Sequence, residues 1–180
     1  FDVLLFDNFS NHCLANTVEP LRAANALSGQ TLYQWRFLTI DGQPVSSSSG
    51  LQVTPQITLR HAQGDLLIVM PSYGVRALDT PDIAKQLRLA AGRYEKLAGL
   101  DTGSWLLARA GLLDGYQATI HWDEMSSFAE AFPDIDIRRE RFIVDRDRIT
   151  CSGGMKGFDL AMHPVAEAPG EMLALGVAPL

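Results

Sequence analysis

The sequence lacks the cysteine patterns and the long apolar runs that define whole classes of protein. It contains two cysteines, Cys13 and Cys151, which lie far apart and form no CxxC motif. This excludes a disulfide scaffold and a four-cysteine zinc site, and it favours reduced thiols in a cytoplasmic protein. The longest aliphatic run, residues 66–70, is far shorter than the ~20 apolar residues that a membrane helix needs, and no signal peptide is visible.

Basic residues and metal-binding spacings are also scarce. The sequence has 15 Lys and Arg against 21 Asp and Glu, a formal net charge of −6. A chain this acidic is a poor candidate for binding nucleic-acid phosphates by itself. None of the four histidines stands in an HxH, HxxxH or HExxH pattern. We therefore expect no metal site, no cofactor and no membrane partner.

What the sequence does contain is the composition of one folded domain. Hydrophobic residues make up 47% and charged residues 20% of the 180 residues, which fits a globular chain of about one domain. A chain of this length buries roughly 70% of its unfolded surface without help from a disulfide or metal. The first residue falls inside a strand-like apolar run and the last inside a helix-like run, so we expect the natural protein to be longer.

Strand-like apolar runs alternate with amphipathic helical stretches along the chain. Strands are predicted at residues 1–6, 35–40, 65–70, 97–100 and 117–120. Helices are predicted at residues 11–27, 81–91, 103–110, 122–131 and from 155 to about 165. Repeated strand–helix units predict an α/β fold with a mostly parallel central sheet and helices on both faces.

The pattern changes between residues 134 and 150, where apolar residues alternate with charges. Five acidic residues balance five arginines in this segment. This pattern predicts a small, solvated antiparallel extension with a turn at residues 145–147. An interaction patch is the alternative interpretation.

The most informative segment surrounds Asp101. Gly99, Asp101 and Gly103 form a G-x-D-x-G pattern. Its spacing is that of the G-x-S-x-G nucleophile elbow, a tight strand-to-helix turn that exposes its central side chain. Glycines allow the close approach of backbones that this turn requires. The alternative is that Asp101 only caps the following helix.

Longer stretches around this elbow carry a family resemblance. The segment DTGSWLLARAGLLDG at residues 101–115, followed by ATIHW at 118–122, closely resembles the class I glutamine-amidotransferase-like domain of AraC-family transcriptional regulators. That domain belongs to the PfpI-like superfamily. The resemblance covers essentially the whole chain, and the other matching segments are VEPLRAAN at 18–25, SSGL at 48–51, FP at 132–133, SGG at 152–154 and GFDLAMH at 157–163.

The resemblance implies a fold and a place in a larger protein. The fold would be a flavodoxin-like three-layer sandwich, with residues 1–180 as a single sensor domain. An AraC-type helix-turn-helix domain would follow residue 180 and make the contact with DNA. The superfamily also implies a homodimer, and symmetric dimers are the commonest oligomers.

Enzymes of the superfamily have a cysteine at the elbow, a glutamate from the first helix and a histidine after the next strand. By motif, these positions are here Asp101, Glu19 and His121. Because a thiolate is a strong nucleophile near neutral pH and a carboxylate is not, the enzyme activities of the family do not carry over. The alternative is a hydrolase of the same fold in which Asp101 is the nucleophile or base and His121 assists.

The same positions indicate a small-molecule effector. Two close carboxylates, Asp101 and Glu19, would hold negative charge that a small cation can neutralise. Aromatic side chains beside a carboxylate are the usual surroundings of quaternary ammonium and guanidinium groups. Regulators with this elbow resemble sensors of betaine, carnitine or arginine, so we expect a cationic ligand. The predicted ligand-binding residues are Asp101, Glu19, His121, Thr102, Tyr73, Trp122, Trp105 and Phe9.

Each of these assignments has a structural alternative. Glu19 would otherwise be an exposed helix residue, and His121 a hydrogen-bonded core histidine. Trp105 and Trp122 would otherwise be plain core side chains, and Tyr73 part of a turn. For the whole domain, a third hypothesis is a vestigial pocket that serves only dimerisation.

Overall fold

Seven strands form the central sheet, in the order β10-β11-β7-β6-β1-β2-β5. The structure is a computed structural model that describes residues 1–167, 174 and 176–179. Neighbouring strands of this sheet are parallel except for the β10–β11 pair. The strands are β1 (Asp2–Leu5), β2 (Arg36–Thr39), β5 (Ile57–Thr58), β6 (Gly64–Met70), β7 (Tyr94–Leu100), β10 (Phe142–Asp145) and β11 (Arg148–Cys151). Two further pairs join β3 (Val45–Ser46) to β4 (Gln52–Val53) and β8 (Gln117–Ala118) to β9 (Asp136–Ile137).

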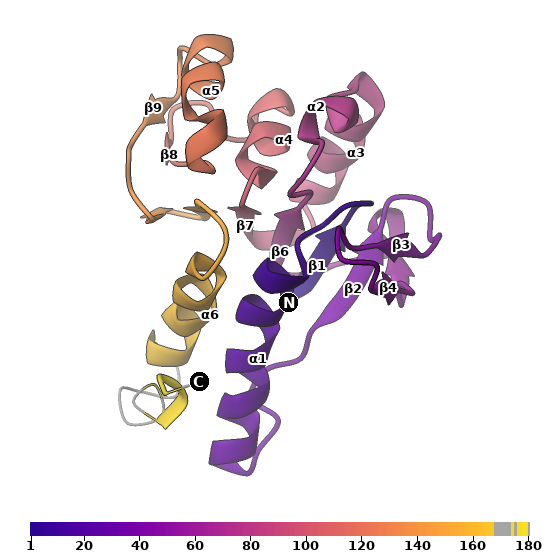
Figure 1. Cartoon of the computed structure of the whole chain (residues 1–180), viewed down its shortest axis with the longest axis vertical. Coiled ribbons are helices and arrows are strands. Elements are labelled where there is room, and N and C mark those ends of the chain that lie inside the picture. The colour runs from indigo at the N-terminus through magenta and orange to yellow at the C-terminus, as the bar shows by residue number, and fades with distance from the viewer. Residues whose placement is uncertain (168–173, 175, 180) are drawn as a thin grey trace.

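Helices cover both faces of this sheet, and α1 lies beside α6 on one of them (Figure 1). The helices are α1 (Asn11–Ser28), α2 (Val75–Leu78), α3 (Pro81–Ala91), α4 (Gly103–Arg109), α5 (Met125–Ala131) and α6 (Lys156–Glu167), with the 3-10 turns η1 (Leu59–His61) and η2 (Trp122–Glu124). In the described part of the chain, no helix combines the length and the apolar character that a membrane crossing requires. The result is the three-layer, flavodoxin-like α/β fold that was predicted.

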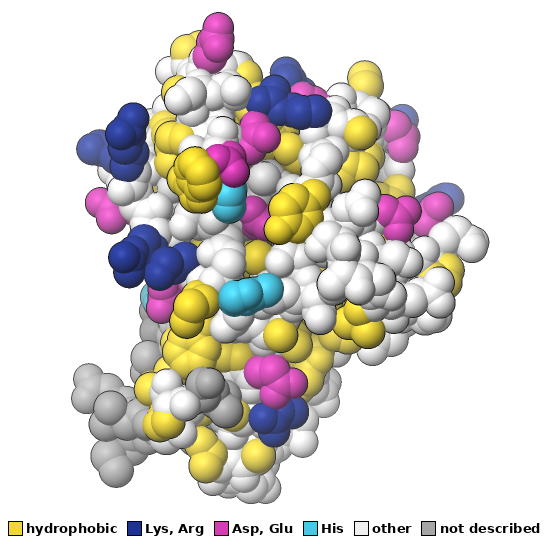
Figure 2. Space-filling model, viewed as in Figure 1, with side chains coloured by type: hydrophobic (Ala, Val, Ile, Leu, Met, Phe, Trp, Pro, Cys, Tyr) yellow, Lys and Arg dark blue, Asp and Glu magenta, His cyan; other side chains and the backbone are white. Residues whose placement is uncertain are grey.

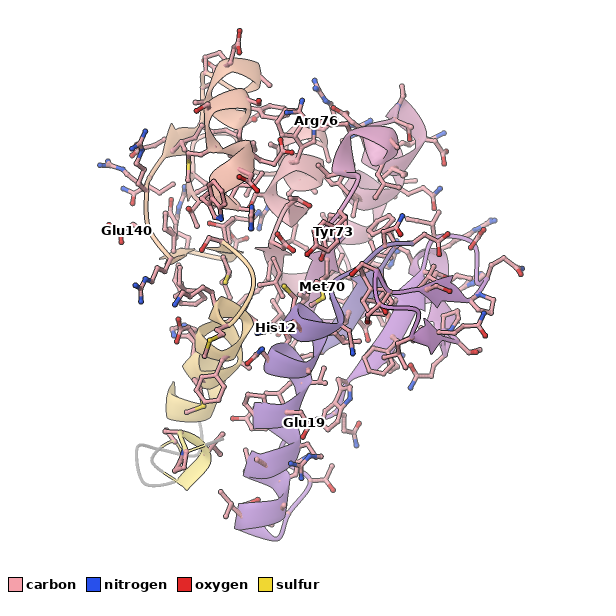
Figure 3. All side chains as sticks on the ribbon, viewed as in Figure 1. His12, Glu19, Met70, Tyr73, Arg76 and Glu140 are labelled. Carbon is pink, nitrogen blue, oxygen red and sulfur yellow. The ribbon has the colours of Figure 1, made fainter. Side chains whose placement is uncertain are left out.

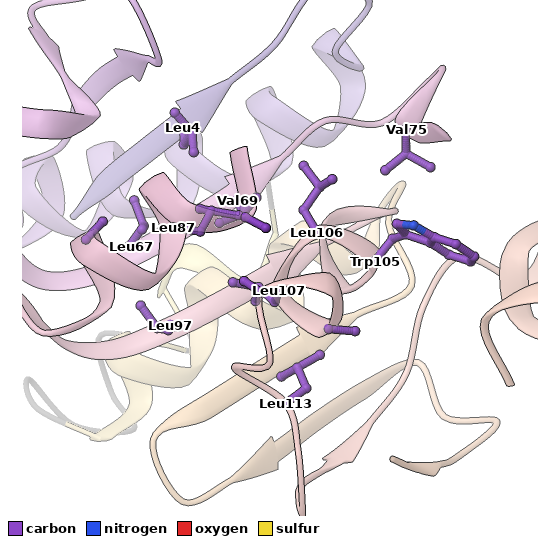
Figure 4. Close-up of a cluster of buried hydrophobic side chains, with 14 of the residues drawn as sticks. Leu4, Leu67, Val69, Val75, Leu87, Leu97, Trp105, Leu106, Leu107 and Leu113 are labelled. Atoms are coloured by element: carbon purple, nitrogen blue, oxygen red, sulfur yellow. The ribbon is translucent and has the colours of Figure 1, made fainter. Parts of the chain in front are cut away.

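The two faces of the sheet build two separate cores, because successive strand residues point to opposite sides. The core beneath α1 and α6 includes Val3, Leu5, Ile68, Leu14 and Leu160. The core beneath α3 and α4, shown in Figure 4, includes Leu4, Leu67, Val69, Leu87 and Leu107. Burial on both faces explains why the strands read as continuous apolar runs. Each fully buried side chain of this kind contributes roughly 1.5–3 kcal/mol to stability.

Local signals set the ends of the helices. Helix α1 begins after Ser10, whose side chain accepts a hydrogen bond of 3.2 Å from the backbone N–H of Cys13. It ends at Gly29, whose φ of 68° is the left-handed conformation favoured after a helix. Helix α3 begins at Pro81 with Thr80 as its N-cap. These two helices match their predicted ranges closely.

The hairpin near residues 134–150 is antiparallel as predicted, but it does not stand outside the main sheet. Strand β11 pairs with β10 on one side and in parallel with β7 on the other. Ile149 and Cys151 are buried. The many charges of this segment therefore lie at its turns and on one side, while its apolar residues extend the core. The predicted helix at 122–131 likewise begins as the 3-10 turn η2 before α5.

Candidate functional site

Strand β7 ends in a tight turn that leads directly into α4, with Asp101 at its apex. The Asp101 backbone has a φ of 63°, a left-handed conformation that non-glycine residues seldom adopt. A Cβ on Gly99 would lie 2.6 Å from the backbone nitrogen of Ser104. A Cβ on Gly103 would lie 2.0 Å from the carbonyl oxygen of Val69. Both glycines are therefore required, and the elbow geometry predicted from the sequence is present.

The side chain of Asp101 is buried among groups from three neighbouring segments, with 7% of its surface exposed. The hydroxyl of Ser72, which follows β6, donates a hydrogen bond to it. The thiol of Cys13, in the first turn of α1, donates to Oδ2 over 3.6 Å. Gly153 follows β11 and packs so closely that a Cβ there would lie 2.8 Å from Cγ of Asp101. The carboxylate thus sits where the carboxyl ends of β6, β7 and β11 meet.

Backbone strain is concentrated at the same edge of the sheet. Among the described residues, four non-glycine residues have a positive φ, and three of them, Asn8, Ser72 and Asp101, follow β1, β6 and β7. The backbone N–H of Ser10 donates to Oγ of Ser72 over 3.0 Å and holds that turn in place. Such conformations cost about 1–3 kcal/mol each and cluster at functional sites. In doubly wound sheets, this edge is also where ligands bind.

The electrostatics of Asp101 favour a cationic partner. Burial raises the pKa of its carboxyl above the usual range, while the hydrogen bond from Ser72, the nearby His121 and the thiol of Cys13 oppose that shift. None of the ion pairs within the described residues includes Asp101. A buried carboxylate without a charged partner is costly, and a bound cation offsets that cost.

Cys13 is a site residue that the sequence analysis missed. Besides its contact with Asp101, its sulfur accepts a hydrogen bond of 3.0 Å from the backbone N–H of Gly154. Burial and the neighbouring Asp101 raise the pKa of the Cys13 thiol to about 11. Burial raises the pKa of the Cys151 thiol to about 12. Both cysteines are therefore protonated at neutral pH, and neither supplies the thiolate on which cysteine catalysis depends.

Three of the predicted ligand-binding residues lie beside the elbow. Tyr73 follows Ser72, and the backbone N–H of His121 donates to the carbonyl oxygen of Asp101 over 3.0 Å. Trp122 follows His121, and the two rings are 5.6 Å apart. Tyr73 and Trp122 are 61% and 74% exposed, and Figure 3 shows Tyr73 and His12 near the carboxyl ends of the strands. Figure 2 shows hydrophobic and histidine side chains together in the middle of this face. Their role toward a ligand stays a prediction.

Glu19 is not part of the elbow, contrary to the expectation of a second carboxylate beside Asp101. Its side chain is about half exposed in the middle of α1 and pairs with Arg22 over 2.5 Å (Figure 3). The position on α1 that faces the elbow belongs instead to Cys13. Cys13 lies in the first turn of the helix, whereas Glu19 lies almost two turns further from the sheet edge.

Three other predicted ligand-binding residues have their partners inside the protein. Trp105 is 1% exposed, and its Nε1 donates to Asp79 over 2.8 Å. Phe9 is completely buried in the core beneath α1. The hydroxyl of Thr102 donates to the carbonyl oxygen of Ser72 over 2.6 Å, which ties the elbow to the neighbouring turn. Thr102 is also the N-cap of α4, so the alternative in which Asp101 is only a cap is wrong.

A cavity of about 400 Å³ lies between the segments 120–126, 139–141 and Ser152. Two of its lining residues, Ile120 and Trp122, flank His121 in the sequence, and Ser152 precedes Gly153. Within the described residues, no group of three His, Cys, Asp or Glu side chains is arranged to hold a metal ion. The cavity is lined by Ile120, Trp122, Met125, Ser126, Arg139, Glu140, Arg141 and Ser152.

Comparisons with known proteins point in one direction. No protein-family model matches the chain. It is 40% identical over 176 residues to the HTH-type transcriptional regulator GbdR of Pseudomonas aeruginosa, covering 97% of this chain and 48% of that protein. It is 31% identical to an AraC family transcriptional regulator from Pseudomonas putida of known crystal structure, with a TM-score of 0.85 and coverage of 99% and 96%.

A ThiJ/PfpI family protein from Pseudomonas syringae shares the fold at 24% identity, with a TM-score of 0.81 and coverage of 98% of this chain and 72% of that one. The chain spans about half the length of the curated regulators that it matches.

Proposed function

The chain belongs to the AraC family of transcriptional regulators and has the PfpI-like fold, and on this premise we propose that it is the non-catalytic, ligand-sensing part of such a regulator. Its curated relatives are about twice as long and are described as HTH-type. We place a helix-turn-helix domain beyond residue 180 and assign the DNA contact to it. The net charge of −6 supports that division of labour. A homodimer acting in the cytoplasm completes the proposal.

The proposed effector is a small cation, such as a betaine-, carnitine- or arginine-like metabolite. The observation that carries this proposal is the buried Asp101 carboxylate, which has no ion-pair partner among the described residues. The exposed rings of Tyr73 and Trp122, each next in sequence to a residue that bonds to Asp101, support it. Aromatic faces and a carboxylate together attract quaternary ammonium or guanidinium groups.

Binding at this edge can act as a switch. The elbow joins β6, β7, β11 and the first turn of α1, so a ligand that neutralises Asp101 changes the balance between arrangements of several elements. A ligand shifts such an equilibrium only by its differential affinity for the two states. About 5.5 kcal/mol is needed to move a population from 1:99 to 99:1.

The second candidate is a hydrolase that uses Asp101, and one observation favours it. His121 lies close enough to influence the carboxyl electrostatically, as a general base for a carboxylate-centred reaction would. Against it, a carboxylate is a weaker nucleophile than the thiolate that cysteine enzymes of this superfamily use. The thiols of Cys13 and Cys151 are protonated at neutral pH. We therefore assign the site to binding.

A thermal-shift screen tests the proposed function. The purified domain is heated with choline, glycine betaine, carnitine or arginine, and with 3,3-dimethyl-1-butanol as the uncharged isostere of choline. A ligand that binds the native state at ~100 times its Kd stabilises it by about 2.7 kcal/mol. We expect at least one cation to raise the melting temperature and the isostere to leave it unchanged. An equal shift with the isostere, or no shift at all, contradicts the proposal.

A further inference from the structure

The exposed rings of Tyr73 and Trp122 take their places from the backbone segments that carry them. The two side chains are 61% and 74% exposed, so little of either ring is packed. Tyr73 follows Ser72, whose hydroxyl donates to the carboxylate of Asp101. Trp122 follows His121, whose backbone N–H donates to the carbonyl oxygen of Asp101 over 3.0 Å. Where the rings lie therefore depends on how these two segments are held.

An ion pair joins the same two segments a few residues beyond the rings. Arg76 in α2 donates from Nη2 to Oε2 of Glu124 in η2 over 2.8 Å. Arg76 comes three residues after Tyr73, on the segment that leaves β6 (Figure 3), and Glu124 comes two residues after Trp122. The segments are thus connected twice, by hydrogen bonds at Asp101 and by this ion pair, with one aromatic residue between the two connections on each side.

This ion pair is anchored on the buried core. Isolated exposed ion pairs contribute little, because two long side chains lose freedom when they form. Here the guanidinium of Arg76 lies over the ring of Trp105, 3.6 Å from its centre, in a cation–π contact. Trp105 is buried and is itself held by a hydrogen bond to Asp79. The side chain of Glu124 is only 26% exposed. Because this contact already holds Arg76, the pair ties Glu124 to a fixed point.

We infer that Arg76 and Glu124 are positioning residues of the cation site, an inference that rests on the proposed function. Together they hold the segments of Tyr73 and Trp122 at the separation that suits a bound cation. A cation is attracted to a ring only within about 6 Å of its centre, so a displaced segment weakens the contact.

The opposite charges of the pair distinguish this role from a direct electrostatic one. Acting directly on a bound cation, Arg76 would weaken binding and Glu124 would strengthen it. Removal of Arg76 would then tighten binding. Under the positioning role, loss of either partner frees the segments and weakens binding.

Calorimetric titrations with choline and arginine, a quaternary ammonium and a guanidinium compound, test this inference. Glu124→Gln and Arg76→Gln break the pair, whereas Arg76→Lys keeps the charge and the single hydrogen bond. Glu124→Gln leaves the contact of Arg76 with Trp105 in place, so the test does not depend on Arg76→Gln alone. Melting temperatures without ligand verify that each variant folds.

Asp136→Asn and Arg138→Gln are the matched controls. They remove the same charges from an ion pair of similar length, 2.7 Å, which joins residues only two apart in the chain. This pair therefore ties no two distant segments together, and its loss should leave the site as it is.

We expect Glu124→Gln and Arg76→Gln each to weaken the binding of a cation that the wild type binds by about tenfold, the cost of ordering two side chains again. Arg76→Lys and both controls should stay within about twofold of the wild type. A tighter-binding Arg76→Gln, an Arg76→Lys as weak as Arg76→Gln, or unchanged affinity in both pair-breaking variants overturns the inference and leaves the cation site standing. A wild type that binds neither probe overturns the proposed function and the inference together.

Discussion

The sulfur of Cys13 lies 3.6 Å from Oδ2 of Asp101 and donates its hydrogen to that carboxylate. The elbow residue is thus a carboxyl group, and the cysteine beside it is its hydrogen-bond donor. The pairing joins the first turn of α1 to the end of β7, residues 88 apart in the chain. Because the thiol keeps its proton, the carboxylate is the group of this pair that can carry charge near neutral pH.

The first prediction concerns thiol reactivity. With a pKa of about 11 for Cys13 and about 12 for Cys151, well under ~1% of either is thiolate at pH 7.5. Iodoacetamide should therefore leave both residues unmodified in the folded domain over a time that fully alkylates the chain in urea. Peptide mass spectrometry provides the measurement. Rapid alkylation of native Cys13 would show a reactive thiolate and revive the enzyme hypothesis.

The second prediction is a pH dependence of binding. Burial raises the pKa of Asp101, so the carboxyl keeps its proton at pH values where it is ionised in the unfolded chain. A cation needs the ionised form. The affinity for choline, whose own charge does not change, should therefore fall as the pH drops through the raised pKa.

The raised pKa of Asp101 also makes the free energy of unfolding depend on pH, in the opposite direction to the affinity for choline. Because the folded state holds the proton more tightly, the contribution of Asp101 to the free energy of unfolding decreases as the pH rises through this window. Asp101→Asn should abolish both trends. A pH dependence of choline binding that survives in this variant would contradict the assignment of the trend to Asp101.

A third prediction uses two adjacent glycines. A Cβ at Gly153 would lie 2.8 Å from Cγ of Asp101, whereas one at Gly154 meets no atom within 4 Å. Both have a positive φ, so alanine costs about 1 kcal/mol or more of backbone strain at either position. Only Gly153→Ala should also displace the carboxylate and abolish cation binding. Equal binding by the two variants in a thermal-shift titration would argue against a site at Asp101.

The fourth prediction separates the two tryptophans near the elbow. Trp105→Ala should lower the free energy of unfolding by about 3–5 kcal/mol, because the ring is fully buried. Trp122→Ala should change stability by less than about 0.5 kcal/mol, because its ring is 74% exposed. Trp122→Ala should instead weaken the binding of the cation. Urea unfolding and calorimetry measure the two quantities, and a destabilised Trp122→Ala with normal affinity would contradict the assignment.

The fold was predictable because its signals are local. Apolar strand runs, the Ser10 cap, the Gly29 end and Pro81 at the start of α3 act within a few residues, and the structure follows them. The elbow was also predictable, since Gly99 and Gly103 are at the two positions where a side chain cannot fit.

The composition of the site was less predictable, because it depends on which turn of a helix reaches the sheet edge. Glu19 has the expected charge but lies too far along α1, and Cys13 faces Asp101 instead. Aromatic type alone did not separate buried Trp105 from exposed Trp122. Arg139 and Arg141 were predicted only as part of a charged hairpin. The structure shows that they line a cavity, whereas the other arginines of the hairpin are held in ion pairs.

The most direct test of the central claim is the affinity of glycine betaine for the wild-type domain and for Asp101→Asn, measured by titration calorimetry at pH 7.5. Asparagine preserves the shape and one of the two acceptor oxygens but removes the charge. Loss of a buried charge pair costs 2 kcal/mol or more, so the account predicts an affinity at least about 30-fold weaker in the variant. Affinities within about twofold of each other would contradict the claim that the Asp101 carboxylate holds the cation.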